Sequence, residues 1–348
     1  MNTVDANKKN RWICTTPNQI KLFKKTMLIV SATALLTLIL LYFFGGTFRF
    51  LYADLIIDIT DREAIITIKE RMMKEELVML ANNIATMCIS IFSVVLTALF
   101  FMFLTGGSEK NSDSYISLKP KFPKYTLILI VVGLSIVYFF AYLSDMFDET
   151  LRFVFGIEKY ASAFYGFPRT PAGVIVYFIS IVITPSLFEE FMFRYLMLNA
   201  LQKYGNAFAI VVTSVLFGFI HGSTSAFFFA TALGMFSAYI AIKTKSIWFS
   251  VVLHAAVNSV AMIMEYVGSR FSMNKSYFFN LVYIDFIFAI SIIATFMFIK
   301  KNKKLELAEH KNHVHIKRRI KIFGFLNLIS VLFFVIVILI SAGDYYLL

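Results

Sequence analysis

The sequence predicts an all-α, polytopic membrane protein with about eight to nine transmembrane helices. Of its 348 residues, 59% are hydrophobic and only 16% are charged, and the mean hydropathy is +0.75. Soluble domains contain roughly 45–50% apolar and about 25% charged residues. The composition therefore excludes a water-soluble globular domain, and it excludes a disordered chain or a disulfide scaffold as well.

Nine apolar runs come close to the length of about 20 residues that an α-helix needs to cross a bilayer. They span Met27–Phe44, Leu80–Leu104, Tyr125–Tyr142, Pro171–Phe188, Asn206–His221, Ser225–Ile242, Ile247–Val267, Tyr277–Ile299 and Ile320–Ile340. The fourth run continues to about Leu201. The fifth is short and ends in polar residues, which makes it a candidate for a helix that stops inside the bilayer.

Lysine and arginine gather on alternate connections between these runs, and the strongest cluster is Lys300–Arg319. If nine helices alternate, the basic segments all lie on one side, which the positive-inside rule makes cytoplasmic. The N-terminus is then cytoplasmic, and the short C-terminus lies outside. The opposite side is expected to carry loops of mixed charge, such as Asp145–Arg152. This distribution explains the net charge of +12 better than nucleic-acid binding does.

Two adjacent carboxylates, Glu189 and Glu190, interrupt the fourth apolar run. An ionisable side chain within a transmembrane helix costs roughly 2.5–3.5 kcal/mol on insertion scales, so it is a functional candidate. Glu190 and Arg194 are four residues apart on a helix and can pair. Glu189 points about 100° away and has no local cation, which suits a general base. The alternative is a helix end with two solvated glutamates, and the apolar stretch Phe191–Leu201 argues against it.

Two further polar sets lie in the apolar runs that follow. His221 ends the fifth run, and its imidazole can accept a proton or bind a metal, although a lone histidine is more often a satisfied core residue. His254 and Asn258 are four residues apart, so both face one direction and can donate hydrogen bonds to an oxyanion. Their alternative role is a polar pair that joins two helices. Tight turns connect the three helices, so we expect the three sets to be neighbours.

The depths of these residues in the bilayer are expected to differ. Glu189 and His221 lie roughly 21–22 Å from the turn that joins their helices, at a rise of 1.5 Å per residue. His254 lies only about 14 Å from Lys245 by the same rise. His254 is therefore expected to be shallower, which predicts a cavity open toward the cytoplasmic half.

At these positions the chain resembles a known family. The ordered motifs E-E-x-x-x-R, F-x-x-x-H and H-x-x-x-N on consecutive apolar helices are similar to those of the CAAX prenyl endopeptidase and bacteriocin-processing (CPBP/ABI) family of intramembrane proteases. The resemblance covers roughly Pro171–Val267 and implies a central ABI-type helical core. We expect four regions: a cytoplasmic arm (1–26), N-terminal transmembrane helices and loops (27–170), the catalytic core (171–268), and C-terminal transmembrane helices with a basic cytoplasmic loop (269–348).

The resemblance also implies roles for the first set of residues. Glu189 would be the base that activates a water molecule, with help from His221. Glu190 would be a second acid of the site, supported by Arg194. No serine or cysteine nucleophile is needed.

The same resemblance implies that His254 and Asn258 stabilise the oxyanion. It leaves open whether zinc is bound or catalysis needs no metal. Glu189, His221 and His254 would be the ligands if zinc is bound, since two histidines and one carboxylate suit a catalytic zinc with an open position.

The predicted function is therefore an intramembrane endopeptidase of the glutamic or metallo type. Its expected partners are membrane lipid and a peptide or membrane-protein substrate, in bacteriocin or signal-peptide maturation or in self-immunity. Two other classes stay open: a proton-coupled transporter, in which buried charges form the path, and a non-catalytic immunity or scaffold protein. The Lys-, Phe- and Ile-rich composition is compatible with an AT-rich bacterial gene, so we expect an integral protein of a bacterial cell membrane.

Overall fold

The computed structural model describes residues 16–61, 68–106, 115–159, 167–271, 316–343 and 345–347, and the single positions 286, 289, 290, 293, 296, 300 and 314. Side chains are described in these ranges except at 46–61, 68–74 and 345–347. Most of the predicted run Tyr277–Ile299 and most of the basic cluster Lys300–Arg319 lie outside the described residues.

The described chain is built almost entirely from helices. They are α1 (Pro17–Asp61), α2 (Ile68–Thr105), α3 (Thr126–Phe155), α4 (Pro171–Phe178), α5 (Thr184–Glu190), α6 (Asn199–Gln202), α7 (Asn206–Phe219), α8 (Thr224–Thr244), α9 (Trp248–Arg270), α11 (Arg318–Phe325) and α12 (Leu328–Gly343). Two π-helical segments, η1 (Ile179–Ile183) and η2 (Phe191–Leu198), join α4, α5 and α6 into one continuous rod. A short antiparallel pair of strands joins β1 (Ile157–Lys159) to β2 (Tyr345–Leu347).

Six helices in the described part of the chain are long and apolar enough to cross a membrane. They cover Pro17–Gly45, Glu75–Thr105, Thr126–Phe155, Pro171–Gln202, Thr224–Thr244 and Trp248–Arg270. The pair α11 and α12, bent by 52°, makes a seventh if it counts as one span. The prediction of an all-α, polytopic membrane protein is confirmed. Helix α7 has only 14 residues, as expected of the short fifth run.

One predicted loop is helical instead. The segment Asp145–Arg152 belongs to α3, which continues to Phe155. Its charges are compensated locally: Asp148 is buried and accepts a hydrogen bond of 2.7 Å from Thr224. The Arg152 guanidinium lies within 3.9 Å of Asp148 and within 3.3 Å of Glu158. Because the acidic groups have partners, the helix continues through this segment, which was predicted to be a loop from its charged residues.

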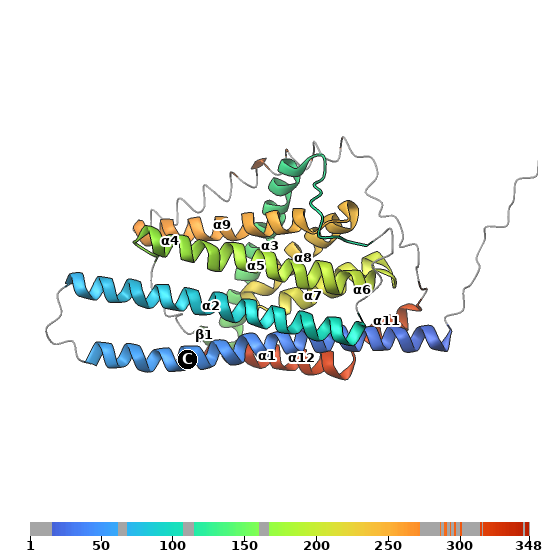
Figure 1. The fold of residues 1–348 in the computed structure, drawn as a ribbon, viewed down its shortest axis with the longest axis horizontal. Coiled ribbons are helices and arrows are strands. Elements are labelled where there is room, and N and C mark those ends of the chain that lie inside the picture. Colours follow the sequence, from blue (N-terminus) through green and yellow to red (C-terminus); the bar gives the residue numbers. More distant parts are fainter. Residues whose placement is uncertain are drawn as a thin grey trace, which may run out of the picture.

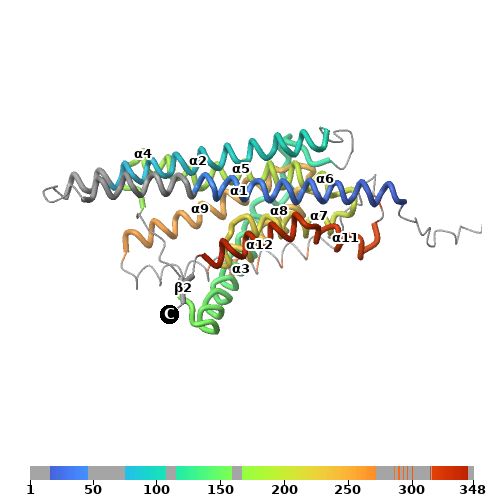
Figure 2. The backbone as a smooth tube through the Cα atoms, turned by 90° about the horizontal axis from the view of Figure 1, so that it is seen from below, coloured from blue at the N-terminus to red at the C-terminus, as the bar shows by residue number. Residues whose placement is uncertain are grey.

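The rod of α4 to α6 lies at the centre of the arrangement in Figure 1, between α2 and α9. Helices α1 and α2 run side by side along the long axis, and α12 lies beside α1 (Figures 1 and 2). Helix α8 packs against both α3 and α7. Gly218 allows α7 and α8 to approach closely, because it has no side chain at their contact. A Cβ at this position would lie only 2.1 Å from Thr231 Oγ1.

Local sequence signals fix both ends of the rod. Thr170 caps α4 by accepting a hydrogen bond of 3.0 Å from the Gly173 amide, and Pro171 occupies the first turn. At the other end Gly205, with φ of 119°, turns the chain from α6 into α7. The paired glutamates therefore lie within a helix that is anchored at both ends.

Candidate active site

Glu190 and Arg194 form a buried ion pair at the junction of α5 and η2. Arg194 Nε lies 3.0 Å from Glu190 Oε2, and the two side chains are 1% and 0% exposed. The pairing predicted from their spacing is confirmed. In a membrane-spanning segment a buried charge needs such a partner. The guanidinium also rests on the Phe217 ring, with Cζ 4.5 Å from the ring centroid, a cation–π contact.

The contact is an ion pair rather than an aligned hydrogen bond. Glu190 Oε2 and both terminal nitrogens of Arg194 are buried and have no hydrogen-bond partner among the described residues. The pair is therefore held by charge and by packing on Phe217, and it leaves hydrogen-bonding capacity unused.

His254 reaches the same carboxylate from α9. Its Nδ1 lies 3.0 Å from Glu190 Oε1, and the residue is 3% exposed. His254 therefore meets the Glu190 carboxylate, although a purely α-helical rise placed it shallower than Glu189 and His221. One reason is η2: its bonds run from residue i to i+5, so it rises less per residue than the α-helix assumed for that depth.

Phe217 on α7 joins this cluster to His221. Its ring centroid lies 5.1 Å from the His221 ring and 5.8 Å from the His254 ring, both in edge-to-face arrangement. The Arg194 guanidinium makes its cation–π contact with the same ring. The structure therefore brings residues of all three predicted sets around one aromatic side chain.

The hydrogen bond of His221 defines its tautomer. His221 Nδ1 lies 2.8 Å from the Phe217 carbonyl oxygen. A carbonyl oxygen only accepts, so Nδ1 carries the hydrogen. The Nε2 of a neutral His221 then keeps its lone pair and can accept a proton.

Glu189 differs from its neighbour in its contacts. Its Oε2 is inaccessible to solvent and has no hydrogen-bond partner among the described residues. Its carboxylate also acts electrostatically on Arg194, more weakly than Glu190 does. Both glutamates have a buried oxygen without a hydrogen-bond partner, but that of Glu190 lies 3.0 Å from Arg194 Nε. The Glu189 oxygen has no such ion pair among the described residues, so it is the one that a ligand could use.

Asn258 contacts the rod at a different place. Its Nδ2 donates a hydrogen bond of 2.9 Å to the carbonyl of Ile181, within the π-helical segment η1. The predicted oxyanion donor thus uses one of its two amide hydrogens inside the protein, and the other is left for a ligand. This partner was not predictable from the sequence, because no sequence pattern distinguishes a π-helical turn from an α-helical one.

The residues do not form a metal centre in this arrangement. In the part of the chain described here, no group of three His, Cys, Asp or Glu side chains lies close enough to hold a metal ion. Glu189, His221 and His254 are all described, so they do not fit a three-ligand zinc site in this conformation. Zinc stays a prediction of the family resemblance.

Sequence reasoning missed a second polar contact between the rod and α9. The Tyr177 hydroxyl on α4 donates a hydrogen bond to Glu265 Oε2 on α9. Glu265 is an acidic residue inside the predicted run Ile247–Val267, which is the signal that could have identified it.

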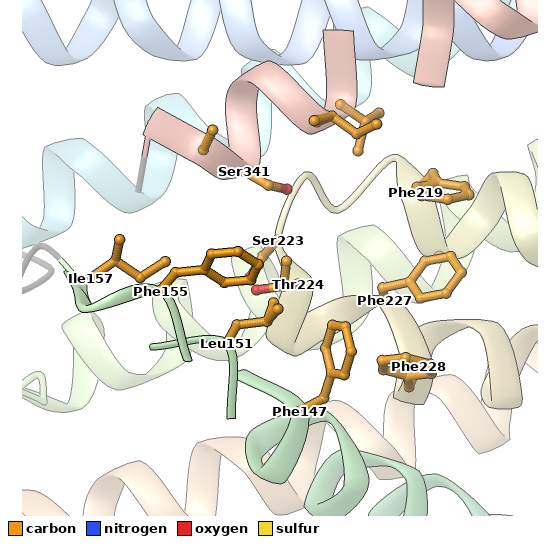
Figure 3. Close-up of a pocket in the computed structure, with 14 residues that line it drawn as sticks. Phe147, Leu151, Phe155, Ile157, Phe219, Ser223, Thr224, Phe227, Phe228 and Ser341 are labelled. Carbon is orange, nitrogen blue, oxygen red and sulfur yellow. The ribbon is translucent and has the colours of Figure 1, made fainter. Parts of the chain in front are cut away.

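Two apolar cavities flank the cluster, and neither is lined by any of the six predicted residues. One, of about 370 Å³, lies between α2 and the α5–η2 junction and includes Leu187, Phe188 and Phe191. The other, of about 680 Å³, lies between α3, α8 and α12, and Phe219 and Ser223 line it (Figure 3). Its walls include Gly218 and Phe219 from the last turn of α7.

Comparison with known proteins identifies the central part of the chain. Residues 171–260 match the family described as type II CAAX prenyl endopeptidase Rce1-like. This core is similar to that family. The Rce1-like core contains all six predicted site residues, from Glu189 to Asn258, and it confirms the resemblance drawn from the motifs.

The chain is also similar to YdiL of Bacillus subtilis (strain 168), which is named as a candidate membrane peptidase. The two sequences are 28% identical over 141 residues, which is 38% of this chain and 58% of YdiL. The similarity therefore spans less than two thirds of that relative. No solved structure matches the chain.

Proposed function

We propose that this chain is a membrane-embedded endopeptidase that hydrolyses a peptide bond by attack of an activated water molecule. The observation that carries the proposal is the Glu190 carboxylate, which is buried between Arg194 and His254 in a membrane-spanning bundle. Beside it, Glu189 keeps an oxygen without a hydrogen-bond partner. The Rce1-like core and the similarity to YdiL support peptide hydrolysis as the chemistry.

Glu189 and Glu190 have different roles in the proposed reaction. The charge of Glu190 is matched by Arg194, and its other oxygen bonds to His254. Glu190 therefore acts as a positioning residue that orients the imidazole. Glu189 has no such partner and acts as the general base, a role that contributes typically 10²–10⁴-fold to a rate.

The attacking water binds between Glu189 and His221. Both groups are hydrogen-bond acceptors toward it, since the Nδ1 hydrogen of His221 is committed to the Phe217 carbonyl. The water donates one hydrogen to Glu189 Oε2 and the other to His221 Nε2. Its lone pair is then free to attack the carbonyl carbon of the substrate.

The developing oxyanion is stabilised by His254 and Asn258. The Nδ1 of His254 faces Glu190, so Nε2 is the nitrogen that faces the substrate. Because Nδ1 already donates to Glu190, a second hydrogen bond from Nε2 requires the imidazolium form of His254, and Glu189 and Glu190 together then balance the charges of Arg194 and His254. The second amide hydrogen of Asn258 provides the other donor. Removal of one such donor costs roughly 10²–10³-fold in rate in enzymes of this kind.

The reaction balances without a covalent intermediate on the protein. The water oxygen bonds to the carbonyl carbon, and its proton passes to Glu189. The same proton then moves to the amide nitrogen as the carbon–nitrogen bond breaks, which releases an amine and a carboxylic acid that keeps the second hydrogen of the water. The substrate backbone must be locally unwound at this point, because a helical peptide carbonyl in the membrane is engaged in its own helix.

The substrate class follows from the surroundings of the site. The cavity beside Leu187, Phe188 and Phe191 is apolar and lies against the segment that carries the glutamates. A membrane-associated apolar peptide suits such walls. Maturation of a bacteriocin or signal peptide, or self-immunity, would present such a substrate in a bacterial membrane.

The proposal is tested in cells that express the full chain or its Glu189→Gln variant. Mass spectrometry of peptide N-termini in the membrane fraction is expected to find new termini with the wild-type chain and none with Glu189→Gln. Glu149→Gln is the matched control, because Glu149 is 77% exposed at the far end of α3. Identical sets of termini in cells with the wild-type chain and with Glu189→Gln would overturn the proposal.

A further inference from the structure

The length of α7 indicates that the turn that carries His221 lies within the membrane. Helix α7, Asn206–Phe219, has 14 residues, which is about 21 Å at 1.5 Å per residue. The hydrocarbon core of a bilayer is about 30 Å thick. The end of α7 therefore stops short of the far surface, as a helix that ends inside the bundle.

The last four carbonyls of α7, from Leu216 to Phe219, accept hydrogen bonds within the turn, from the Ile220, His221 and Gly222 amides and from His221 Nδ1. The carbonyls of His221 and Gly222 that follow accept no backbone hydrogen bond in the described part of the chain. Water is not available in the bilayer core, and each unsatisfied group costs several kcal/mol there. Other parts of the chain must donate hydrogen bonds to this turn.

Two side chains supply these hydrogen bonds. The Tyr42 hydroxyl of α1 donates to the His221 carbonyl at 2.9 Å. The Ser341 hydroxyl of α12 donates to the Gly222 carbonyl at 2.9 Å. Both donors lie outside the Rce1-like region 171–260, near opposite ends of the sequence.

Gly222 shows how closely the two helices hold the turn. Its φ is +61°, which favours glycine. A Cβ at this position would lie 1.8 Å from Tyr42 Oη and 3.2 Å from Ile340 Cγ2. The backbone after His221 is thus enclosed by α1 on one side and α12 on the other.

These contacts determine where the imidazole of His221 points. The carbonyl of His221 is fixed by Tyr42 and the next carbonyl by Ser341, so the direction of the Cα–Cβ bond is fixed. The Nδ1–H bond to Phe217 then sets the ring. We propose that Tyr42 and Ser341 are positioning residues for His221, supplied by helices outside the family core. The catalytic consequence rests on the proposed function.

The surroundings of Ser341 permit a discriminating substitution. Figure 3 shows the Ser341 hydroxyl at the edge of the apolar cavity, near Ser223 and Thr224. Ser341→Thr keeps the hydroxyl, and its added methyl group can enter this cavity. Ser341→Ala removes only the hydroxyl.

The variants are Tyr42→Phe, Ser341→Ala and Ser341→Thr, each in the full chain in lipid nanodiscs. Two controls remove hydroxyls that tie the same helices elsewhere. Tyr204→Phe removes a bond of 3.0 Å to Thr26 on α1. Ser330→Ala removes a bond of 2.7 Å between α12 and Ser31 on α1.

The first measurement needs no substrate. Diethyl pyrocarbonate modifies histidine nitrogens, and peptide mass spectrometry follows its rate at His221, with His254 as internal reference. We expect Tyr42→Phe and Ser341→Ala to raise the His221 rate severalfold relative to His254. Ser341→Thr and both controls are expected to match the wild type. Equal His221 rates in all variants would overturn the proposal.

The second measurement is cleavage of the substrate peptide that the mass spectrometry of peptide N-termini identifies. We expect Tyr42→Phe and Ser341→Ala to lower kcat by about 10–100-fold, the scale of a 1 Å misplacement, with KM little changed and Ser341→Thr near wild type. A changed modification rate with unchanged kcat would overturn the positioning role. Absence of cleavage by the wild type would instead refute the proposed function, while the modification rates still decide whether the two hydroxyls hold the turn.

Discussion

The Glu190 carboxylate and the His254 imidazole, 64 residues apart in the chain, meet at 3.0 Å inside the helical bundle. The contact joins α5 to α9, and with Arg194 it gives Glu190 two ion-pair partners, whereas Glu189 forms no ion pair within the described part of the chain. This asymmetry between adjacent glutamates is the basis of the roles proposed for them. It leads to predictions that separate folding from chemistry.

Loss of Arg194 is expected to destabilise the fold. Arg194→Met leaves Glu190 as a buried charge without its cation, which costs about 3–5 kcal/mol. Thermal unfolding of the purified chain measures the effect. The double variant Glu190→Gln with Arg194→Met is expected to recover part of the loss, because both charges are gone. An unchanged unfolding temperature for Arg194→Met would contradict the buried pair.

Loss of the His254 imidazole is expected to act on the reaction. His254→Ala removes the proposed oxyanion donor, and we expect kcat to fall about 10²–10³-fold with KM little changed. Kinetics with the identified peptide provide the measurement. A rise in KM with constant kcat would show that His254 binds the substrate uniformly and does not stabilise the transition state.

Asn258 is expected to contribute to folding as well as to catalysis. Asn258→Leu removes the donor to the Ile181 carbonyl, and a buried acceptor left unsatisfied costs about 1–3 kcal/mol. Hydrogen exchange of the amides in η1 is expected to accelerate. Unchanged exchange in that segment would mean that the bond to Ile181 contributes nothing to its stability.

The N-terminus of α4 offers a test remote from the site. Glu76 accepts hydrogen bonds from the Arg169 amide at 2.9 Å, the Thr170 amide at 3.0 Å and the Thr170 hydroxyl at 2.6 Å. Glu76→Gln weakens these charge-assisted bonds, and a loss of roughly 1–2 kcal/mol is expected.

Glu75→Gln is the matched control for this test. Glu75 is 49% exposed and lies 3.8 Å from Arg169. Such an exposed pair is worth only about 0–1 kcal/mol. Equal unfolding temperatures for Glu75→Gln and Glu76→Gln would contradict the assignment of Glu76 as the residue that holds α2 to α4.

Much of the site was accessible from the sequence, because its signals are local. Ionisable residues inside apolar runs can be recognised directly in the sequence. The i, i+4 spacing of Glu190 and Arg194 predicted their pairing. The contact of Glu190 with His254 was harder to predict. Its expected depth depended on an α-helical rise that the π-helical segment η2 does not follow.

The hydroxyls of Tyr42 and Ser341 could not be identified from pattern alone. Each lies in a long apolar helix, where a tyrosine or serine is unremarkable in sequence. A physical signal did exist: the short run Asn206–His221 ends at membrane depth, so its carbonyls need donors from elsewhere. Which helices would supply them depends on the packing of α1 and α12, which no local rule predicts.

Glu189 is expected to perform the chemistry, whereas Glu190 is expected to maintain the architecture. The most direct test measures thermal unfolding and peptide cleavage on the same preparations of the wild type, Glu189→Gln and Glu190→Gln. We predict that Glu189→Gln keeps the wild-type unfolding temperature and loses cleavage, whereas Glu190→Gln unfolds at a lower temperature. Cleavage at the wild-type rate by a folded Glu189→Gln chain would contradict the account.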